Sequence, residues 1–221
     1  DITAATGGVG SSDQKLVVST DVISVTAWDS IFIYAVDSIG LRELISQTGS
    51  ITLEAERDIL SASAGSGMNL SAGTIDLISQ GGDIGTRSVP LNVRCSNISA
   101  SAAGAISLRS FSHMNIVRMA ASRTIYISGV SLQGSDISTS LLELDVTGFI
   151  GTAEAPISTS VQSVRLKAGQ GVYMRNSGTL SIVNVTGDEV EIEADTITSA
   201  NSAGNSVVAD SLKLTAANGI G

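Results

Sequence analysis

The 221-residue sequence predicts an all-β solenoid in which successive coils stack their strands in parallel. Two observations indicate this fold class. A short glycine-containing motif returns at nearly regular intervals, which is typical of elongated repeat proteins. Between its copies, short segments alternate apolar and polar residues with the period of two expected for half-buried strands.

The glycine motif marks a superrepeat of about 70 residues. Its final glycines lie 75, 66 and 70 residues apart, and the two prolines of the chain, Pro90 and Pro156, each follow one of them by five positions. The superrepeats span about 8–82, 83–148 and 149–218 of a single domain, 1–221. Because the sequence begins and ends at the same point of the repeat, we expect this chain to be part of a longer chain or fibre. The four copies are Gly8-Val9-Gly10, Asp83-Ile84-Gly85-Thr86, Phe149-Ile150-Gly151-Thr152 and Gly219-Ile220-Gly221.

Six segments show the alternation most clearly, with Ile, Val, Leu, Met and Ala inward and polar residues outward. Strand-like segments recur every 17 to 26 residues, which predicts roughly 10–11 coils. The stretch 38–48 could hold a single turn of helix. A β-sandwich is the main rival fold, but its hairpins favour Asn-Gly or Asp-Gly turns, and Asn218-Gly219 is the only such pair. The six segments are 23–27, 51–55, 68–72, 164–168, 190–194 and 212–216.

Composition narrows the class of protein further. Aromatic residues are only 3%, so Ile, Leu, Val and Ala must build the core. The net charge of −9 argues against nucleic-acid binding, which needs a basic face. The longest apolar run, 31–36, is too short for a transmembrane segment. Cys95 is the only cysteine, which excludes an internal disulfide. It lies two residues after Val93, so on a strand it should point inward on the same face.

Two sequence elements resemble repeats of filamentous-haemagglutinin-type large exoproteins. The first runs from Gly82-Asp83-Ile84-Gly85-Thr86 to Pro90-Leu91 and recurs from Phe149 to Ile157. The second runs from Gly49-Ser50-Ile51 to Asp58-Ile59. The resemblance covers most of the chain diffusely. It implies a right-handed parallel β-helix that is exported by a Gram-negative bacterium and displayed as an adhesive fibre.

Trp28, Phe32 and Tyr34 form one candidate contact surface, because three of the seven aromatic residues fall in this short stretch. Ile31, Ile33 and Ala35 have inward parity, so Phe32 and Tyr34 should face outward. An exposed apolar strip would suit sugar stacking or a protein partner. Alternatively, an adjacent loop or coil covers the strip, and the sequence leaves both readings open.

Arg94 and Arg109 form a second candidate contact surface. Residues 84–135 contain five arginines and no acid, and the parity of Val93 and Leu108 places Arg94 and Arg109 outside. Such a band on an acidic rod could meet an anionic glycan or the acidic band of a neighbouring rod. Chance scatter of the five arginines around the coils is the alternative.

No residue pattern predicts catalysis, a cofactor or a metal site. Glu189, Glu191, Glu193 and Asp195 share one outer strand face, which could bind Ca²⁺ or hydrolyse glycans but fits a solvated face better. His113 is the only histidine, which hardly supports a histidine metal cluster or a catalytic triad. Three glycosylation sequons begin at Asn69, Asn97 and Asn184, each with its Asn expected outward.

The sequence therefore predicts a non-enzymatic structural or adhesive rod of an extracellular bacterial surface protein or filament. It would act through stiffness and repeated weak contacts. Expected partners are other copies joined end to end and host or matrix glycans or proteins. A carbohydrate-active β-helix enzyme and an inert surface-layer or matrix scaffold are the alternatives.

Overall fold

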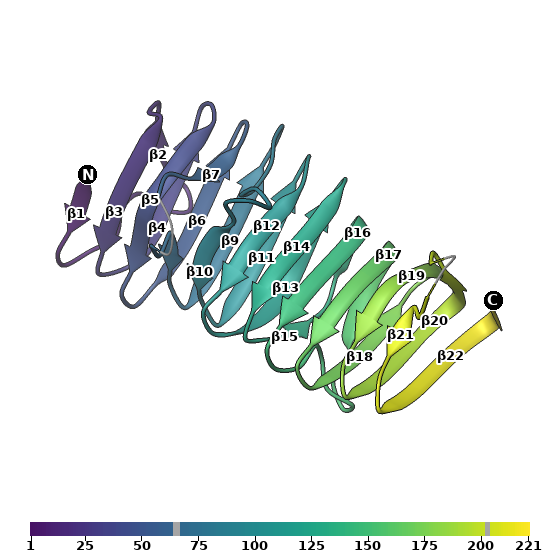
Figure 1. Cartoon of the computed structure of the whole chain (residues 1–221). Helices are drawn as coiled ribbons and strands as arrows, with labels where there is room; N and C mark the ends of the chain where they lie inside the picture. The colour runs from purple at the N-terminus through teal and green to yellow at the C-terminus, as the bar shows by residue number, and fades with distance from the viewer. Residues whose placement is uncertain (64–66, 202–203) are drawn as a thin grey trace.

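The chain folds into a parallel β-helix of about 11 turns, which confirms the predicted fold class. The structure is a computed structural model that describes residues 1–63, 67–201 and 204–221. Within these ranges there is no helix, and every strand pairing is parallel. Figure 1 shows the coils stacked along one axis, with the two termini at opposite ends of the stack.

One side of the solenoid is a ladder of parallel strands that runs through the whole stack. Its strands are β1 (Ile2–Ala4), β3 (Val22–Ala27), β5 (Ile39–Ser46), β8 (Leu70–Ser71), β10 (Leu91–Arg94), β12 (Ile106–Ser110), β14 (Thr124–Gly129), β16 (Ile137–Val146), β17 (Ile157–Ala168), β19 (Thr179–Thr186) and β21 (Val207–Val208).

A second ladder forms the opposite wall, and the long strands β13, β16, β17, β19 and β20 bend around corners to pair on more than one side. A short strand, β7 (Ile59–Ser61), pairs with β5. The second ladder contains β2 (Leu16–Val18), β4 (Ile31–Ala35), β6 (Ser50–Ala55), β9 (Thr74–Ser79), β11 (Asn97–Ala102), β13 (His113–Ala121), β15 (Ser131–Gly134), β18 (Gly171–Asn176), β20 (Glu189–Ser199) and β22 (Ser211–Ile220).

The core consists of columns of like side chains stacked from coil to coil. In one column, isoleucines at 31, 51, 75, 98 and 116 lie in register on five successive coils, and each is at most 1% exposed. Burying each such side chain contributes about 1.5–3 kcal/mol. The outward neighbours can vary freely, which explains why the sequence alternates so clearly.

Two local expectations were wrong. The stretch 38–48 contains no helical turn, because Ile39–Ser46 is strand β5 with a bulge at Arg42, which adds one residue relative to β3. Asn69 points inward rather than outward and is fully buried. Its amide donates to the carbonyl oxygen of Leu41 at 2.8 Å and accepts from the backbone N–H of Asn92 at 2.9 Å. Buried backbone groups need such partners, so the amide replaces an apolar side chain here.

Each of the first three glycine motifs opens a six-residue loop that leaves a strand and returns to it. Ile84 pairs with Ile106 and Leu91 with Leu108, so loop 85–90 stands opposite the single residue Ser107. Loops 10–15 and 151–156 stand in the same way opposite Phe32 and Tyr173. Loop 85–90 therefore projects from the first ladder, and loops 10–15 and 151–156 project from the second.

The glycines of these loops share one backbone conformation. Gly10, Gly85 and Gly151 have φ values of 69°, 65° and 66°, in the left-handed region that disfavours other residues. A Cβ at each of them would also lie under 3.0 Å from the backbone nitrogen of the residue that resumes the strand. The spacing of the motif in the sequence is therefore a spacing of identical turns.

Candidate functional site

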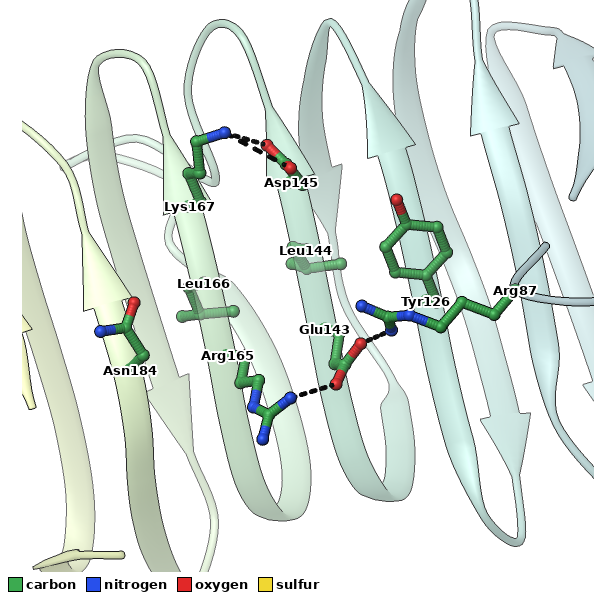
Figure 2. Close-up of a pocket in the computed structure, with 9 residues that line it drawn as sticks. All are labelled: Arg87, Tyr126, Glu143, Leu144, Asp145, Arg165, Leu166, Lys167 and Asn184. Atoms are coloured by element: carbon green, nitrogen blue, oxygen red, sulfur yellow. Dashed lines mark hydrogen bonds and ion pairs between the residues drawn. The ribbon is translucent and has the colours of Figure 1, made fainter. Parts of the chain in front are cut away.

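The outer face behind loop 85–90 carries a hollow of about 170 Å³ whose lining combines cations, carboxylates and one aromatic ring. Three of its residues, Tyr126, Glu143 and Arg165, are in register on β14, β16 and β17, and Asn184 continues the column on β19. Figure 2 shows this column together with Arg87, which reaches it from loop 85–90. The column lies on the outer surface because its neighbours Leu144 and Leu166 are buried.

Glu143 is the centre of this cluster and is only 5% exposed. Arg87 forms an ion pair with its Oε2, while Arg165 Nη1 lies 3.3 Å from its Oε1. The guanidinium of Arg87 also lies over the ring of Tyr126, with Cζ 4.5 Å from the ring centroid. Figure 2 shows the two arginines approaching the carboxylate from opposite sides.

This arrangement acts as a strap across the coils. Loop 85–90 belongs to the coil before β12, so Arg87 passes the coils of β12 and β14 to reach Glu143 on β16. Each oxygen of this nearly buried carboxylate faces a guanidinium group, so the carboxylate has no open side for a substrate. The cluster therefore favours a mechanical role over acid–base chemistry.

Ion pairs between neighbouring coils occur on both ladders of the solenoid. Lys167 Nζ lies 3.2 Å from Asp145 Oδ1, and Figure 2 shows the pair beside the Glu143 cluster. On the second ladder, between β20 and β22, Lys213 Nζ lies 2.5 Å from Glu191 Oε1. Each pair joins residues 22 positions apart in the sequence, one coil from the next. Exposed pairs contribute at most about 1 kcal/mol each, so register and not bulk stability is their main effect.

The acidic strip on β20 points outward as predicted, and each of its acids has a partner. Lys213 pairs with Glu191 as above, Arg175 Nε lies 3.1 Å from Glu193, and the Gly178 backbone N–H donates to Asp195 at 2.9 Å. The hydroxyl of Tyr173 donates to Glu189 at 2.6 Å, and this bond raises the pKa of Tyr173 to about 12. These contacts support a structural role for the strip.

The aromatic candidate surface has the predicted orientation. Phe32 and Tyr34 lie on β4 between the buried Ile31, Ile33 and Ala35, and both are half-buried. Trp28 is more open, with 55% of its surface exposed. The hydroxyl of Tyr34 donates to Glu56 at 2.5 Å, which raises the pKa of Tyr34.

Loop 10–15 runs beside this aromatic surface. The backbone N–H of Phe32 donates to the carbonyl oxygen of Val9 at 2.7 Å, directly before the loop begins. Lys15, at the end of the loop, pairs with Glu54 on β6. Loop 10–15 of the preceding coil therefore borders the strip, and both readings that the sequence left open remain. Trp28 remains its most accessible member.

Arg94 and Arg109 are exposed as predicted and lie on neighbouring coils, since Arg109 is in register with Asn92, two residues before Arg94. The other three arginines of the acid-free window do not form an acid-free band in space. Arg87, Arg118 and Arg123 pair with Glu143, Asp136 and Asp83, which lie outside the window in the sequence. The stacking of the coils thus places an acidic side chain beside three of the five arginines in this window.

Cys95 is buried as predicted, and burial raises the pKa of its thiol to about 12. Asn184 is exposed, and Asn97 is half-buried and accepts a hydrogen bond from Asn115 at 2.9 Å. Among the described residues, no group of three or more His, Cys, Asp or Glu side chains is arranged to hold a metal ion. None of the described segments forms a helix of the length and hydrophobicity needed to span a bilayer.

Sequence reasoning missed the Glu143 cluster because its members are far apart in the chain. Arg87 and Glu143 are separated by 56 positions and three coils. Coil length varies from 17 residues, between Val93 and Ser110, to 26, between Leu44 and Leu70, so columns cannot be counted from the sequence. The one available signal was the outward parity of Glu143 beside Leu142 and Leu144.

Comparison with protein-family models, curated proteins and solved structures finds no match to this chain. The resemblance to filamentous-haemagglutinin-type exoproteins therefore rests on the motifs alone and stays a prediction.

Proposed function

We propose that this chain is a structural rod of an extracellular bacterial surface protein or filament, which acts through stiffness and repeated weak contacts. The observation that carries the proposal is the unbroken parallel ladder from β1 to β21, closed over one apolar core. Bending such a stack would open hydrogen bonds and core contacts on one side, so it resists bending along its whole length.

The outer surface supports the same role. The Arg87–Glu143–Arg165 strap spans five coils, and single ion pairs tie further coils. The net charge of −9 opposes side-by-side clumping of rods. The bacterial and extracellular setting is proposed from the motif resemblance, whose glycine turns share one geometry in all three loops.

Solution scattering of the purified chain tests the rod. We expect a constant cross-section and a length of roughly 50 Å, because about 11 coils are spaced by about 4.8 Å. Electron micrographs at rising concentration test end-to-end assembly, which predicts uniform threads of the same width. A compact, nearly spherical scattering profile would contradict the proposal.

The adhesive part predicts a steep dependence on density, because weak contacts add by multivalency. Beads coated with the chain at increasing density should be retained on host-matrix or cell surfaces only above a threshold. Beads coated with heat-unfolded chain are the control. Failure to be retained at any density would leave an inert scaffold as the remaining function.

A further inference from the structure

A second hollow, of about 180 Å³, lies on another part of the outer surface, and none of the side chains that line it carries a formal charge when His113 is neutral. Its centre is an aromatic pair from different coils. His113 on β13 and Phe149, just before loop 151–156, have ring centroids 6.0 Å apart and planes inclined by 26°. Ser131 on the intervening coil is small and 2% exposed, which allows the two larger rings to meet across it.

A column of amides runs beside the aromatic pair. Asn97, Asn115 and Gln133 are in register on β11, β13 and β15. Asn115 and Gln133 are exposed, and the amide of Asn115 donates to Asn97 Oδ1 at 2.9 Å. His113 and Asn115 are two residues apart on one strand, so rings and amides form two parallel columns about 7 Å apart.

The aromatic column continues toward the C-terminal end. Since Ile150 pairs with Val172, Gly171 is the next-coil neighbour of Phe149. A Cβ at Gly171 would lie 2.6 Å from Cε2 of Tyr173, so the Tyr173 ring lies over the glycine, and its hydroxyl reaches Glu189 on the following coil. Phe149 also lines the adjoining hollow of about 410 Å³, together with Tyr173 and loop 151–156. The two hollows adjoin at Phe149, and together they are called the groove.

We propose that this groove binds an uncharged oligosaccharide or polysaccharide. The C–H face of a sugar ring suits the electron-rich faces of Phe149 and Tyr173. Sugar hydroxyls both donate and accept hydrogen bonds, and each amide of Asn115 and Gln133 offers both functions. The columns repeat at about 4.8 Å from coil to coil, which matches a ligand built from repeated hydroxyl-bearing rings.

The charges around the groove select against polyanions. Glu154, Asp188 and Glu189 line the C-terminal hollow and would repel sulfate or uronate groups. A protein partner is disfavoured as well, since stable protein interfaces bury about 800 Å² per partner around large apolar anchors. The inference gives a ligand class to the contact role proposed above and does not depend on the stiffness of the rod.

Binding to an array of uncharged hexose and N-acetylhexosamine oligosaccharides, printed beside sulfated counterparts, tests the proposal. We expect binding to uncharged members only. Phe149→Ala should weaken it by about tenfold, near the upper limit for one aromatic contact. Gln133→Ala should weaken it by about fivefold, as for one lost hydrogen bond. Gln162→Ala is the matched control for Gln133→Ala, because Gln162 is an exposed glutamine on β17 outside the groove, and it should leave binding unchanged.

Circular dichroism and scattering of each variant separate loss of binding from loss of fold. Gln133 is exposed, so Gln133→Ala keeps the test valid even where Phe149→Ala unfolds the chain. Three results would overturn the proposal: no uncharged glycan binds at millimolar concentration, only sulfated glycans bind, or Gln133→Ala and Gln162→Ala bind equally well. None of these results would alter the rod length, so the proposed structural role would stand or fall separately.

Discussion

Among single residues, Glu143 has the most unusual surroundings, because a nearly buried carboxylate depends on two arginines that are themselves well exposed. Its side chain is 7% exposed, whereas those of Arg87 and Arg165 are 62% and 55% exposed. The two sides of this interaction are therefore unequal. Water can replace the carboxylate around the arginines, but it cannot reach the carboxylate to replace the arginines.

This inequality predicts an ordered series of variants. Glu143→Gln should lower the free energy of unfolding by about 1.5–3 kcal/mol, the value of hydrogen bonds to a charged group. Removing both cations, with Arg87→Met and Arg165→Met together, should cost about 3–5 kcal/mol because it leaves a buried charge without partners. Denaturant titration measures both, and Arg94→Met is the control with an effect within about 0.5 kcal/mol. A double variant no less stable than Glu143→Gln would contradict the argument.

Two neighbouring acids should respond to pH in opposite directions. Hydrogen bonds from Lys15 and Gln80 lower the pKa of Glu54 below 4.5. The stability that Glu54 contributes is then complete above about pH 4.5 and is lost as the pH falls through its lowered pKa. Burial raises the pKa of Asp76 above 3.8, so the fold is penalised once the pH exceeds 3.8 and Asp76 ionises.

Stability measured from pH 2 to 7 tests both signs. Glu54→Gln should flatten the loss of stability in acid, and Lys15→Met should reproduce most of that change because it removes the main cause. Asp76→Asn should make the chain more stable at pH 7 and leave it unchanged at pH 2. The assignments would be wrong if Glu54→Gln kept the full acid dependence, or if Asp76→Asn were destabilising at pH 7.

At the scale of elements, the glycine-marked loops fix where the strands may be interrupted. Gly85 has a φ of 65°, and a Cβ there would lie under 3.0 Å from the carbonyl oxygen of Ser107 on the next coil. Gly178 also has a positive φ, of 91°, but has open space where its Cβ would stand. A comparison of substitutions at these two glycines thus distinguishes the cost of backbone strain from the cost of steric conflict.

Gly85→Ala should therefore cost more than Gly178→Ala. We expect Gly178→Ala to lower the free energy of unfolding by about 1–2 kcal/mol, the cost of a left-handed conformation. Gly85→Ala should cost about 3 kcal/mol or more, since the strand at Ser107 must also move. Gly10→Ala and Gly151→Ala should match Gly85→Ala, because the loops are alike. Equal costs at Gly85 and Gly178 would show that the close approach is unimportant.

The strands themselves were largely predictable, whereas their partners were not. Ile51–Ala55 and Val190–Ala194 alternate strictly because one face is buried, and both lie within strands, β6 and β20. In β5 the bulge at Arg42 spaces the buried Leu41 and Leu44 by three, which imitates helical periodicity. Asn69 is an exception to the rule that polar residues point outward, because its hydrogen-bond partners are backbone groups on other coils.

For the candidate sites too, the sequence predicted which side chains face outward but not which of them lie next to each other. Outward placement of Phe32, Tyr34, Arg94 and Arg109 could be derived from the parity of their neighbours alone. The meeting of His113 with Phe149 could not, because it requires the lengths of two successive coils. A sequence of this kind therefore specifies which side chains reach the surface, and the stacking specifies which of them become neighbours.

For the whole molecule, stacking makes the coil the unit that can be added or removed. Each coil contacts chiefly the coils directly before and after it, so stability is close to a sum of local terms. Ile33 on β4 and Leu53 on β6 are in register and both fully buried. Joining position 33 directly to position 54 would therefore excise one complete coil and leave the strand direction, register and side-chain parity continuous.

We expect deletion of residues 34–53 to give a folded rod that is shorter by one coil, about 4.8 Å. Lys15, Leu16 and Phe32 are retained, so loop 10–15 keeps its strand and its pairing with Glu54.

Deletion of residues 34–43, half a coil, is the matched control. It removes fewer residues but carries the strand that contains Leu44 around to the wrong wall, away from its partners Val25 and Leu70. Scattering should show a shortened rod for the first variant, and circular dichroism with thermal unfolding should show a loss of cooperative structure for the second. If the half-coil deletion folded as well as the full-coil deletion, the coils could not be the independent units on which a stiff rod depends.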